Sequence, residues 1–295
     1  MFRKVSYAFV LSSFLISAVA ADTTALIIQT GPGGLAHKYA MDIEPVLSKI
    51  LGTPIIVEFK PGAQGEVGAA ALSADKKDKL TLMLGQLQPE FPIDQINDIT
   101  PVLDIGTVPV LIIARTGLGI NSLSELAAQP PTKTFTIGIV NGAAQLYWVR
   151  EFVKNYKNVR LVEVPYRQGA AVLADVLGGH IDLGVASASG AAPSVEAGKV
   201  IGLTTLSIGR SNLIPTLKTP REQGIKFKND TVGFAHLILW ANPTANPAVV
   251  NNLRREYTAW AVTPAAQELF KNIDLRVNLK SLSTPAESIR INLGK

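Results

Sequence analysis

The sequence contains no cysteine and only three histidines. Without cysteine the chain cannot form disulfides, thiolate metal sites or a cysteine nucleophile. The histidines, His37, His180 and His236, lie too far apart for a metal-binding motif such as H-E-x-x-H, and no G-x-S-x-G nucleophile turn occurs. We therefore expect no metal site, no cofactor and no catalytic residues.

Charge is also sparse, because charged residues make up 17% of the chain and the formal net charge is only +5. The two densest basic stretches, 76–79 and 254–256, are interrupted by carboxylates and lack interleaved aromatic residues. We therefore expect no nucleic-acid partner. Without residues 1–20, the chain has 26 basic and 23 acidic residues, a net charge of +3, which is a mild bias toward anions.

Hydrophobic residues are abundant at 47%, so the chain is too apolar for intrinsic disorder and should fold around real cores. At about 150 residues per domain, the 295 residues suggest two domains or lobes. No internal repeat and no low-complexity linker separates them. Two lobes that share one continuous chain fit this pattern better than a tandem of independent modules.

The N-terminus has the pattern of a cleaved secretory signal. Arg3 and Lys4 precede an apolar run, 7–19, and Ala18-Val19-Ala20 supplies a small-residue cleavage site. An uncleaved membrane anchor is the alternative, but the run is shorter than the roughly 20 residues that a spanning helix needs. We expect residues 1–20 to be a signal peptide and the mature protein to be exported.

The rest of the chain alternates short β-rich runs with helical patterns, as in an α/β fold with parallel sheets. Helix signals include apolar steps of three and four in 36–50 and capping-box spacing from Ser122 to Glu125. Helix starts are expected at Pro247, at Thr263-Pro264 and at Thr284-Pro285. Further helices are expected at 69–72, 144–156 and 170–177, and strands at 25–30, 55–58, 81–84, 108–114, 135–139, 160–164, 183–186, 201–206 and 231–241.

Glycine-rich turns lie between strands and helices, and Gly31-Pro32-Gly33-Gly34 is the most informative of them. Glycine lets backbone N–H groups and a helix N-terminus converge on an anion such as phosphate or carboxylate. Similar turns occur at 60–68, 141–144 and 165–170, and in open α/β sheets ligands collect at such strand ends. Two alternatives remain: a turn without ligand, and a dinucleotide site with Glu58 as the ribose-binding acid, against which the secretory signal argues.

Several blocks of the sequence together resemble the substrate-binding proteins of tripartite tricarboxylate transporters, the Bug receptor family. The first turn resembles the family's P-P-G-G, and a later block resembles V-P-Y-K/R followed by L-x-D-L-L-G-G-x-V-D. The resemblance covers nearly the whole mature chain. The matching blocks are 31–34, 57–68, 164–167, 173–182, 197–200 and 219–224.

The resemblance implies a two-lobed type II periplasmic binding protein fold of the α/β class, with a ligand cleft between the lobes. Lobe one would comprise 21–117 and 240–295, and lobe two 118–239, with crossovers near 113–122 and 237–242. Similar receptors hold a ligand carboxylate with backbone amides and waters. The ligand-binding residues so implied, or lying in the matching turns, are Gly31, Gly33, Gly34, Leu35, Asn141, Gly142, Ala143, Tyr166, Arg167 and Ala186.

The chain departs from the family pattern in ways that bear on the ligand. Leu35 and its neighbours replace hydroxyl and acidic residues after the first turn, and Ala143 stands where a serine is common. Ala186 stands where relatives have an aspartate that can pair with a ligand amine. A buried ammonium group without a carboxylate partner is costly, so we expect a smaller or more apolar acid rather than an amino acid. His37 is a candidate replacement donor.

We therefore expect a monomeric receptor in the periplasm that captures a small organic acid (carboxylate), closes by a hinge and delivers the acid to the integral membrane permease subunits of a tripartite transporter. Two alternatives from other classes remain. One is an orphan receptor that signals its ligand state to a sensor protein, and the other is a periplasmic hydrolase. The sequence identifies neither the acid nor the permease.

Overall fold

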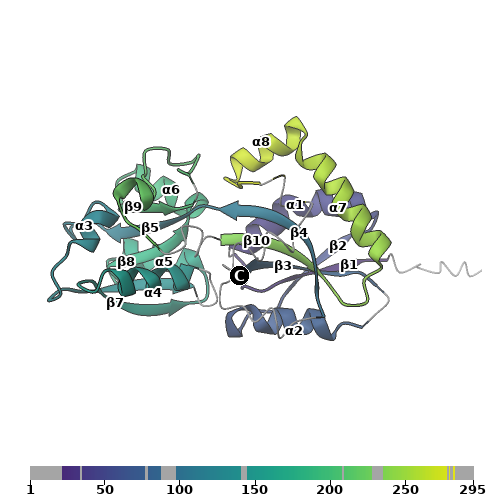
Figure 1. Cartoon of the computed structure of the whole chain (residues 1–295), viewed down its shortest axis with the longest axis horizontal. Coiled ribbons are helices and arrows are strands. Elements are labelled where there is room, and N and C mark those ends of the chain that lie inside the picture. Colours follow the sequence, from purple (N-terminus) through teal and green to yellow (C-terminus); the bar gives the residue numbers. More distant parts are fainter. Residues whose placement is uncertain are drawn as a thin grey trace, which may run out of the picture.

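A computed structural model describes residues 22–33, 35–76, 79–87, 98–140, 145–207, 209–227, 235–277, 279 and 282. They form two lobes that lie side by side, each built on one five-stranded sheet (Figure 1). In these ranges no helix has the length and apolar character needed to cross a bilayer. The signal peptide expected at 1–20 and the helix start expected at Thr284-Pro285 lie outside the described residues.

Lobe one contains the sheet β2-β1-β3-β10-β4. β1 pairs in parallel with β2 and β3, as expected for strand-helix-strand units, whereas β10 is antiparallel to β3 and β4. The strands are β1 (Thr24–Ile28), β2 (Ile55–Phe59), β3 (Thr81–Leu87), β4 (Thr100–Val108) and β10 (Ala235–Ala241).

Lobe two contains the sheet β7-β6-β8-β5-β9. β6 pairs in parallel with β7 and β8, and β5 is antiparallel to β8 and β9. The strands are β5 (Val110–Arg115), β6 (Thr134–Val140), β7 (Arg160–Tyr166), β8 (Leu183–Ser187) and β9 (Val200–Leu206). This α/β architecture of two sheets agrees with the fold class that the sequence predicts.

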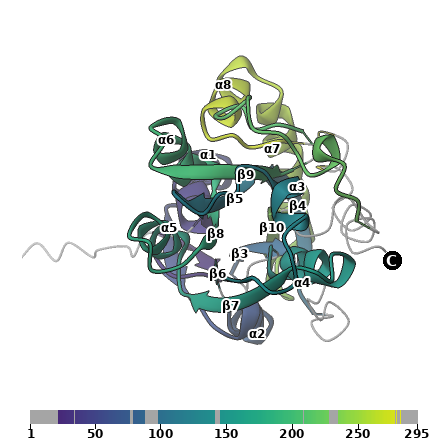
Figure 2. The same ribbon diagram turned by 90° about the vertical axis from the view of Figure 1, so that its left-hand side faces the viewer.

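Helices cover both faces of each sheet. In lobe two, α5 and α6 lie on one face and α3 and α4 on the other (Figure 2). In lobe one, strand side chains alternate: Leu26 and Ile28 face the core with α1 and α7, and Ile27 faces α2. The helices are α1 (Leu35–Leu51), α2 (Glu66–Ala74), α3 (Leu123–Ala127), α4 (Gln145–Asn155), α5 (Gly169–Leu177), α6 (Ala188–Glu196), α7 (Pro247–Ala261) and α8 (Pro264–Asn272).

Helix starts follow the capping signals of the sequence. The Ser122 hydroxyl accepts the Glu125 amide at 3.1 Å, and the Thr263 hydroxyl accepts the Ala266 amide at 3.3 Å. Asn246 caps α7 in the same way, ahead of Pro247 at the first helical position. Such caps satisfy amides that have no partner within the helix, so these three expected helix starts are confirmed.

The chain first passes between the lobes at Pro109, the one residue between β4 and β5. The sequence pattern predicts a single strand, 108–114, and the family resemblance implies a crossover near 113–122. The structure instead assigns Val110 and the rest of β5 to the sheet of lobe two, so lobe two begins before the predicted boundary at residue 118. The chain is back in lobe one by the start of β10, which lies entirely in the first sheet.

A buried carboxylate ties the two lobes together beside this crossover. Asp274, which follows α8 in lobe one, accepts hydrogen bonds from the Ser211 hydroxyl and, at 3.1 Å, from the Asn212 amide. Ser211 and Asn212 belong to the chain that leaves β9 in lobe two. The neighbouring Arg276 pairs its backbone with Thr107 of β4. Residues 274–276, the C-terminal segment, therefore contact both β4 of lobe one and the chain after β9 of lobe two, on one side of the crossover.

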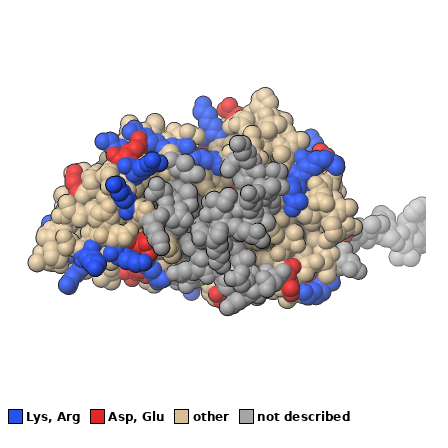
Figure 3. Space-filling view, viewed as in Figure 1, with Lys and Arg blue, Asp and Glu red and all other residues tan. Residues whose placement is uncertain are grey.

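Lysine and arginine side chains occur on both lobes and have acidic neighbours on the face shown in Figure 3. Arg150 pairs with Glu163 at 3.2 Å, and Arg210 with Glu222 at 2.9 Å. Exposed pairs of this kind contribute about 0–1 kcal/mol each. Stability therefore rests on the cores and on buried contacts.

Asp182, before β8, is a partly buried carboxylate on which the stability of lobe two should depend. Its Oδ1 accepts from Arg115 Nε at 3.0 Å and its Oδ2 from the Thr136 amide at 3.0 Å. Burial raises the pKa of Asp182, but these hydrogen bonds outweigh burial and hold the pKa below its ordinary value. The stabilisation is thus present above the unfolded-state pKa and is lost as pH falls through the lower folded-state pKa.

We therefore expect Asp182→Asn to reduce the free energy of unfolding by about 1.5–3 kcal/mol at neutral pH, as for hydrogen bonds to a charged group. The difference from the wild type should fade as pH falls below about 4, the ordinary pKa of an aspartate in an unfolded chain, toward the lower folded-state pKa of Asp182. Urea denaturation of the variant and the wild type across this pH range measures the difference in their free energies of unfolding. Glu163→Gln, at an exposed pair, is the control and should change little; a difference independent of pH would contradict the assignment.

Candidate functional site between the lobes

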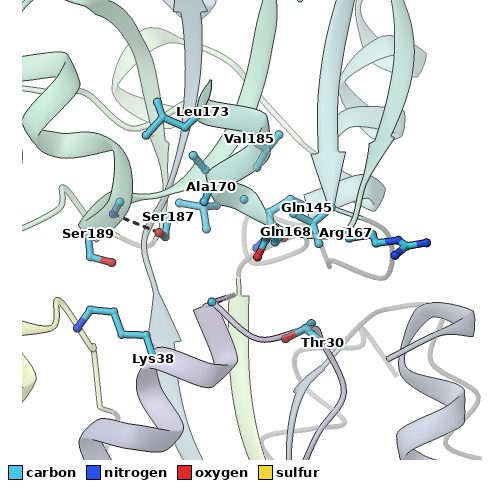
Figure 4. A pocket seen from close by; sticks show the side chains of 16 residues that line it. Thr30, Lys38, Gln145, Arg167, Gln168, Ala170, Leu173, Val185, Ser187 and Ser189 are labelled. Carbon is cyan, nitrogen blue, oxygen red and sulfur yellow. Dashed lines mark hydrogen bonds between the residues drawn. The ribbon is translucent and has the colours of Figure 1, made fainter. Parts of the chain in front are cut away.

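A cavity of about 270 Å³ lies between the lobes (Figure 4). Its volume is slightly below the roughly 300–1,000 Å³ of most small-molecule sites, so it suits a small ligand. Lobe one contributes the turn after β1 and the start of α1, and lobe two contributes the rest. The lining residues are Thr30, Gly33, Lys38, Val110, Val140, Gln145, Arg167, Gln168, Gly169, Ala170, Leu173, Val185, Ala186, Ser187, Ser189 and Gly190.

Several helices begin at this cavity. Gln145, Gly169 and Ser189 lie in the first turns of α4, α5 and α6, and all three line it. α1 begins two residues after Gly33, on the lobe-one side. Each helix N-terminus carries about half a positive charge and amides without helical partners, so the convergence favours a negatively charged group.

The N-terminus of α5 differs from that of α6 in having no side-chain cap. The Ser187 hydroxyl accepts the Gly190 amide at 3.2 Å and so caps α6. Gln168, the N-cap residue of α5, has an extended backbone with φ −157° and ψ 150° and makes no side-chain capping bond. The first-turn amides of α5, at Gly169 and Ala170, therefore face the cavity without a side-chain acceptor.

Gly33 narrows the cavity from lobe one. Its φ of +80° is a left-handed conformation that favours glycine, and a Cβ there would lie 3.2 Å from Gln168 Oε1 of lobe two. The Gly33 amide donates to His37 Nδ1 at 2.9 Å, and the His37 ring contacts Phe59 edge-on at 4.9 Å. His37 thus holds the first turn in place. It accepts the hydrogen bond of the Gly33 amide, which the sequence analysis expected to be donated to a ligand.

Tyr166 ends β7, and its hydroxyl donates to Asp175 Oδ2 at 2.5 Å. Burial, followed by this hydrogen bond and the Asp175 charge, raises the pKa of Tyr166 to about 12. Tyr166 is absent from the described residues that line the cavity. Its side chain supports the turn between β7 and α5 through Asp175.

The basic side chains at the cavity direct their charges elsewhere. Lys38 Nζ bonds Asp42 Oδ2 at 3.2 Å, one turn further along α1. Arg167 is exposed, and its guanidinium points away from the other labelled side chains in Figure 4. The Arg167 guanidinium is therefore not directed at the cavity, and the backbone of its turn is the part that reaches the cavity.

The sequence-predicted site residues divide into three groups. Gly33, Arg167 and Ala186 line the cavity, whereas Gly31 and Tyr166 are not among the described lining residues. Leu35 begins α1, but its side chain is outside the described set, as are Gly34, Asn141, Gly142 and Ala143. The ligand-binding role of all ten residues stays a prediction. In the described ranges no three His, Asp or Glu side chains are grouped as metal ligands would be.

Sequence reasoning missed several residues that line the cavity. Gln168 lies inside the turn that was singled out, and Thr30 directly precedes the first glycine turn, so both could have been found by proximity. Ser187 directly follows the predicted residue Ala186 and could have been found in the same way. Ser189 could not, because the helix α6 that contains it was not predicted. Gln145 gave no signal, since a polar residue at a helix start is ordinarily exposed.

Comparison with known proteins identifies the same family that the sequence blocks resemble. Residues 40–286 match a family described as "Tripartite tricarboxylate transporter family receptor". The protein BugT of Bordetella pertussis is 24% identical over 281 residues, which cover 89% of this chain and 85% of BugT.

Solved structures show the same fold. The periplasmic binding protein BugD superposes with a TM-score of 0.78 at 22% identity, covering 92% of this chain and 94% of BugD. MatC from Rhodopseudomonas palustris, solved with bound malate, superposes with a TM-score of 0.77 at 21% identity, covering 92% of this chain and 97% of MatC. The described chain thus has the two-lobed fold of periplasmic binding proteins.

Proposed function

The chain belongs to the tripartite tricarboxylate transporter receptor family, and we propose that it captures a small organic acid between its lobes and presents the acid to the permease subunits of a tripartite transporter. The uncapped N-terminus of α5 at the cavity is the observation that carries this proposal. Amides in a partly desolvated cleft bind a carboxylate by charge-assisted hydrogen bonds. The malate held by MatC, an organic acid, supports the same ligand class.

The composition of the cavity wall supports an anion over an amine. None of its described lining residues is Asp or Glu, and Ala186, 5% exposed, supplies no carboxylate for an ammonium group. A buried ammonium group would lack a counter-ion and would cost several kcal/mol. Within this proposal Gly169 and Ala170 donate to the acid, and Gly33 and Gln168 close the cleft over it.

We further propose that the protein acts in the periplasm, as the leader pattern of residues 1–20 and the similarity to the periplasmic binding protein BugD suggest. Closure follows ligand binding by rotation of the lobes about the Pro109 crossover, as in other two-lobed receptors. Uptake of the recognised acid should then fail in cells that lack the protein. Intact uptake would favour the sensor role over the transport role.

The ligand class can be tested by thermal unfolding of the purified protein with mono-, di- and tricarboxylates, sugars and amino acids. At 100 times its Kd a ligand stabilises by about 2.7 kcal/mol, which for a chain of this size corresponds to a melting-temperature rise of about 5 °C. We expect such a rise with at least one organic acid and none with sugars or lysine. Rises confined to neutral or cationic compounds would refute the proposal.

A further inference from the structure

Gln145 has a buried amide group whose donor has no partner. It is the first residue of α4, lines the cavity and is 3% exposed. Among the described residues, no group accepts a hydrogen bond from its Nε2. An unpaired buried donor costs about 1–3 kcal/mol, and buried polar groups are nearly always paired in native proteins. The cavity is therefore where a partner for Nε2 would lie.

Thr30 presents a second unpaired group from the opposite lobe. It follows β1, and its Oγ1 is buried without a partner in the described part of the chain. In Figure 4 Thr30 belongs to the lower wall, from lobe one, and Gln145 to the upper wall, from lobe two. The two groups thus supply an amide donor and a hydroxyl to one cavity from both sides.

The wall around these two groups is largely apolar, and no charged side chain of the described lining residues is directed at them. Arg167 points away from them, and Lys38 is paired with Asp42. The remaining wall includes Val110 and Val140. A second carboxylate next to Gln145 would have only the partial charge of the α4 N-terminus, and no cationic side chain, to offset its lost hydration. An uncharged oxygen needs only the donors present.

We infer that Gln145 and Thr30 form a neutral subsite, and that the ligand is a short monocarboxylic acid with an uncharged hydroxyl or amide oxygen at its other end. This inference rests on the proposed function, in which the carboxylate lies at the N-terminus of α5. The ligand oxygen accepts from Gln145 Nε2 and hydrogen-bonds Thr30 Oγ1. Gln145 and Thr30 are then the residues that select among acids of one length.

Four acids with the same chain length test the subsite by isothermal titration: butyrate, 4-hydroxybutyrate, succinamate and succinate, together with the matching five-carbon series. They differ only in a terminal methyl, hydroxyl, amide or carboxylate. A neutral hydrogen bond contributes about 0.5–1.5 kcal/mol. We expect the hydroxyl or amide compound to bind about three- to tenfold more tightly than both the methyl and the carboxylate compound of its series.

Gln145→Leu and Thr30→Val should each reduce this preference to less than twofold while the methyl-terminated acid still binds. Because Gln145→Leu removes an unpaired donor, the melting temperature without ligand should stay the same or rise; a fall would show a structural role and overturn the inference. Unchanged preference in both variants, or tightest binding of the diacid by the wild type, would also overturn it. Equal binding of all four acids refutes the subsite alone, whereas no binding of any acid refutes the proposed function as well.

Discussion

Replacing Gly169 with proline is expected to weaken binding of the recognised acid by about 10- to 100-fold and to leave the fold intact. The substitution removes one amide donor from the N-terminus of α5, at the cavity wall. A hydrogen bond to a charged group contributes about 1.5–3 kcal/mol, and each 1.4 kcal/mol is a factor of ten in Kd. Isothermal titration with the acid that gives the largest thermal shift measures the loss.

The backbone at Gly169 suits proline. Proline is favoured at the first position of a helix. The preceding residue, Gln168, already has the extended backbone that proline requires of its neighbour, with φ −157° and ψ 150°. A Cβ at Gly169 would meet no atom within 4 Å. The variant should therefore be as stable as the wild type, or up to about 1 kcal/mol more stable because its unfolded chain is less flexible.

Gly169→Ala is the matched control, because alanine adds a similar Cβ and keeps the amide. It should bind the acid with nearly the wild-type affinity. If the alanine and proline variants, both folded by circular dichroism, bind the acid equally well, the carboxylate does not lie at the N-terminus of α5.

Gly106→Ala is expected to reduce the free energy of unfolding by about 3 kcal/mol or more. Gly106 lies in β4 near the crossover, with φ +135°, and a Cβ there would lie 2.4 Å from the carbonyl oxygen of Arg276. Backbone strain and overpacking each cost about 1–3 kcal/mol. The Arg276 carbonyl also accepts the Thr107 amide at 3.0 Å, so displacing the C-terminal segment breaks a backbone pair.

The control for this prediction is Gly198→Ala, at φ +64°, where a Cβ would meet no atom within 4 Å. Alanine in this left-handed conformation costs about 1–2 kcal/mol through the backbone alone. Guanidinium denaturation of both variants gives the comparison. Equal losses would mean that the C-terminal segment does not pack on β4 as described.

Elements with a strong local signal were predictable from the sequence. The apolar steps of α1 and the capping residues of α7 and α8 each specify a helix locally, and the structure has those helices. α6 was missed because its small residues carry little apolar periodicity and Pro193 lies inside it. β4 was missed as a separate strand because only Pro109 lies between β4 and β5 in the sequence. The sheet that each strand joins is decided by its pairing with distant strands, which the local sequence does not show.

The turns whose backbone lines the candidate site could be predicted from the sequence, whereas most of the side chains that line it could not. Glycines between strands and helices indicated the turns around Gly33 and Gly169, since only the local order of elements was needed. The unpaired Nε2 of Gln145 depends on burial at 3% exposure, which arises when two distant segments meet. The use of the Gly33 amide by His37 depends likewise on the exact turn geometry.

The single residue between β4 and β5 has a mechanical consequence for such a receptor. Both strands are held in ladders up to Val108 and from Val110, and Asp274 fastens the returning chain, so the connection can flex but cannot stretch. Val110, which lines the cavity directly after the crossover, then stays nearly fixed while points farther from Pro109 move through longer arcs. A ligand would therefore enter and leave on the side of the cavity away from Pro109, and the nearly fixed wall at Val110 would limit the length of the ligands that fit.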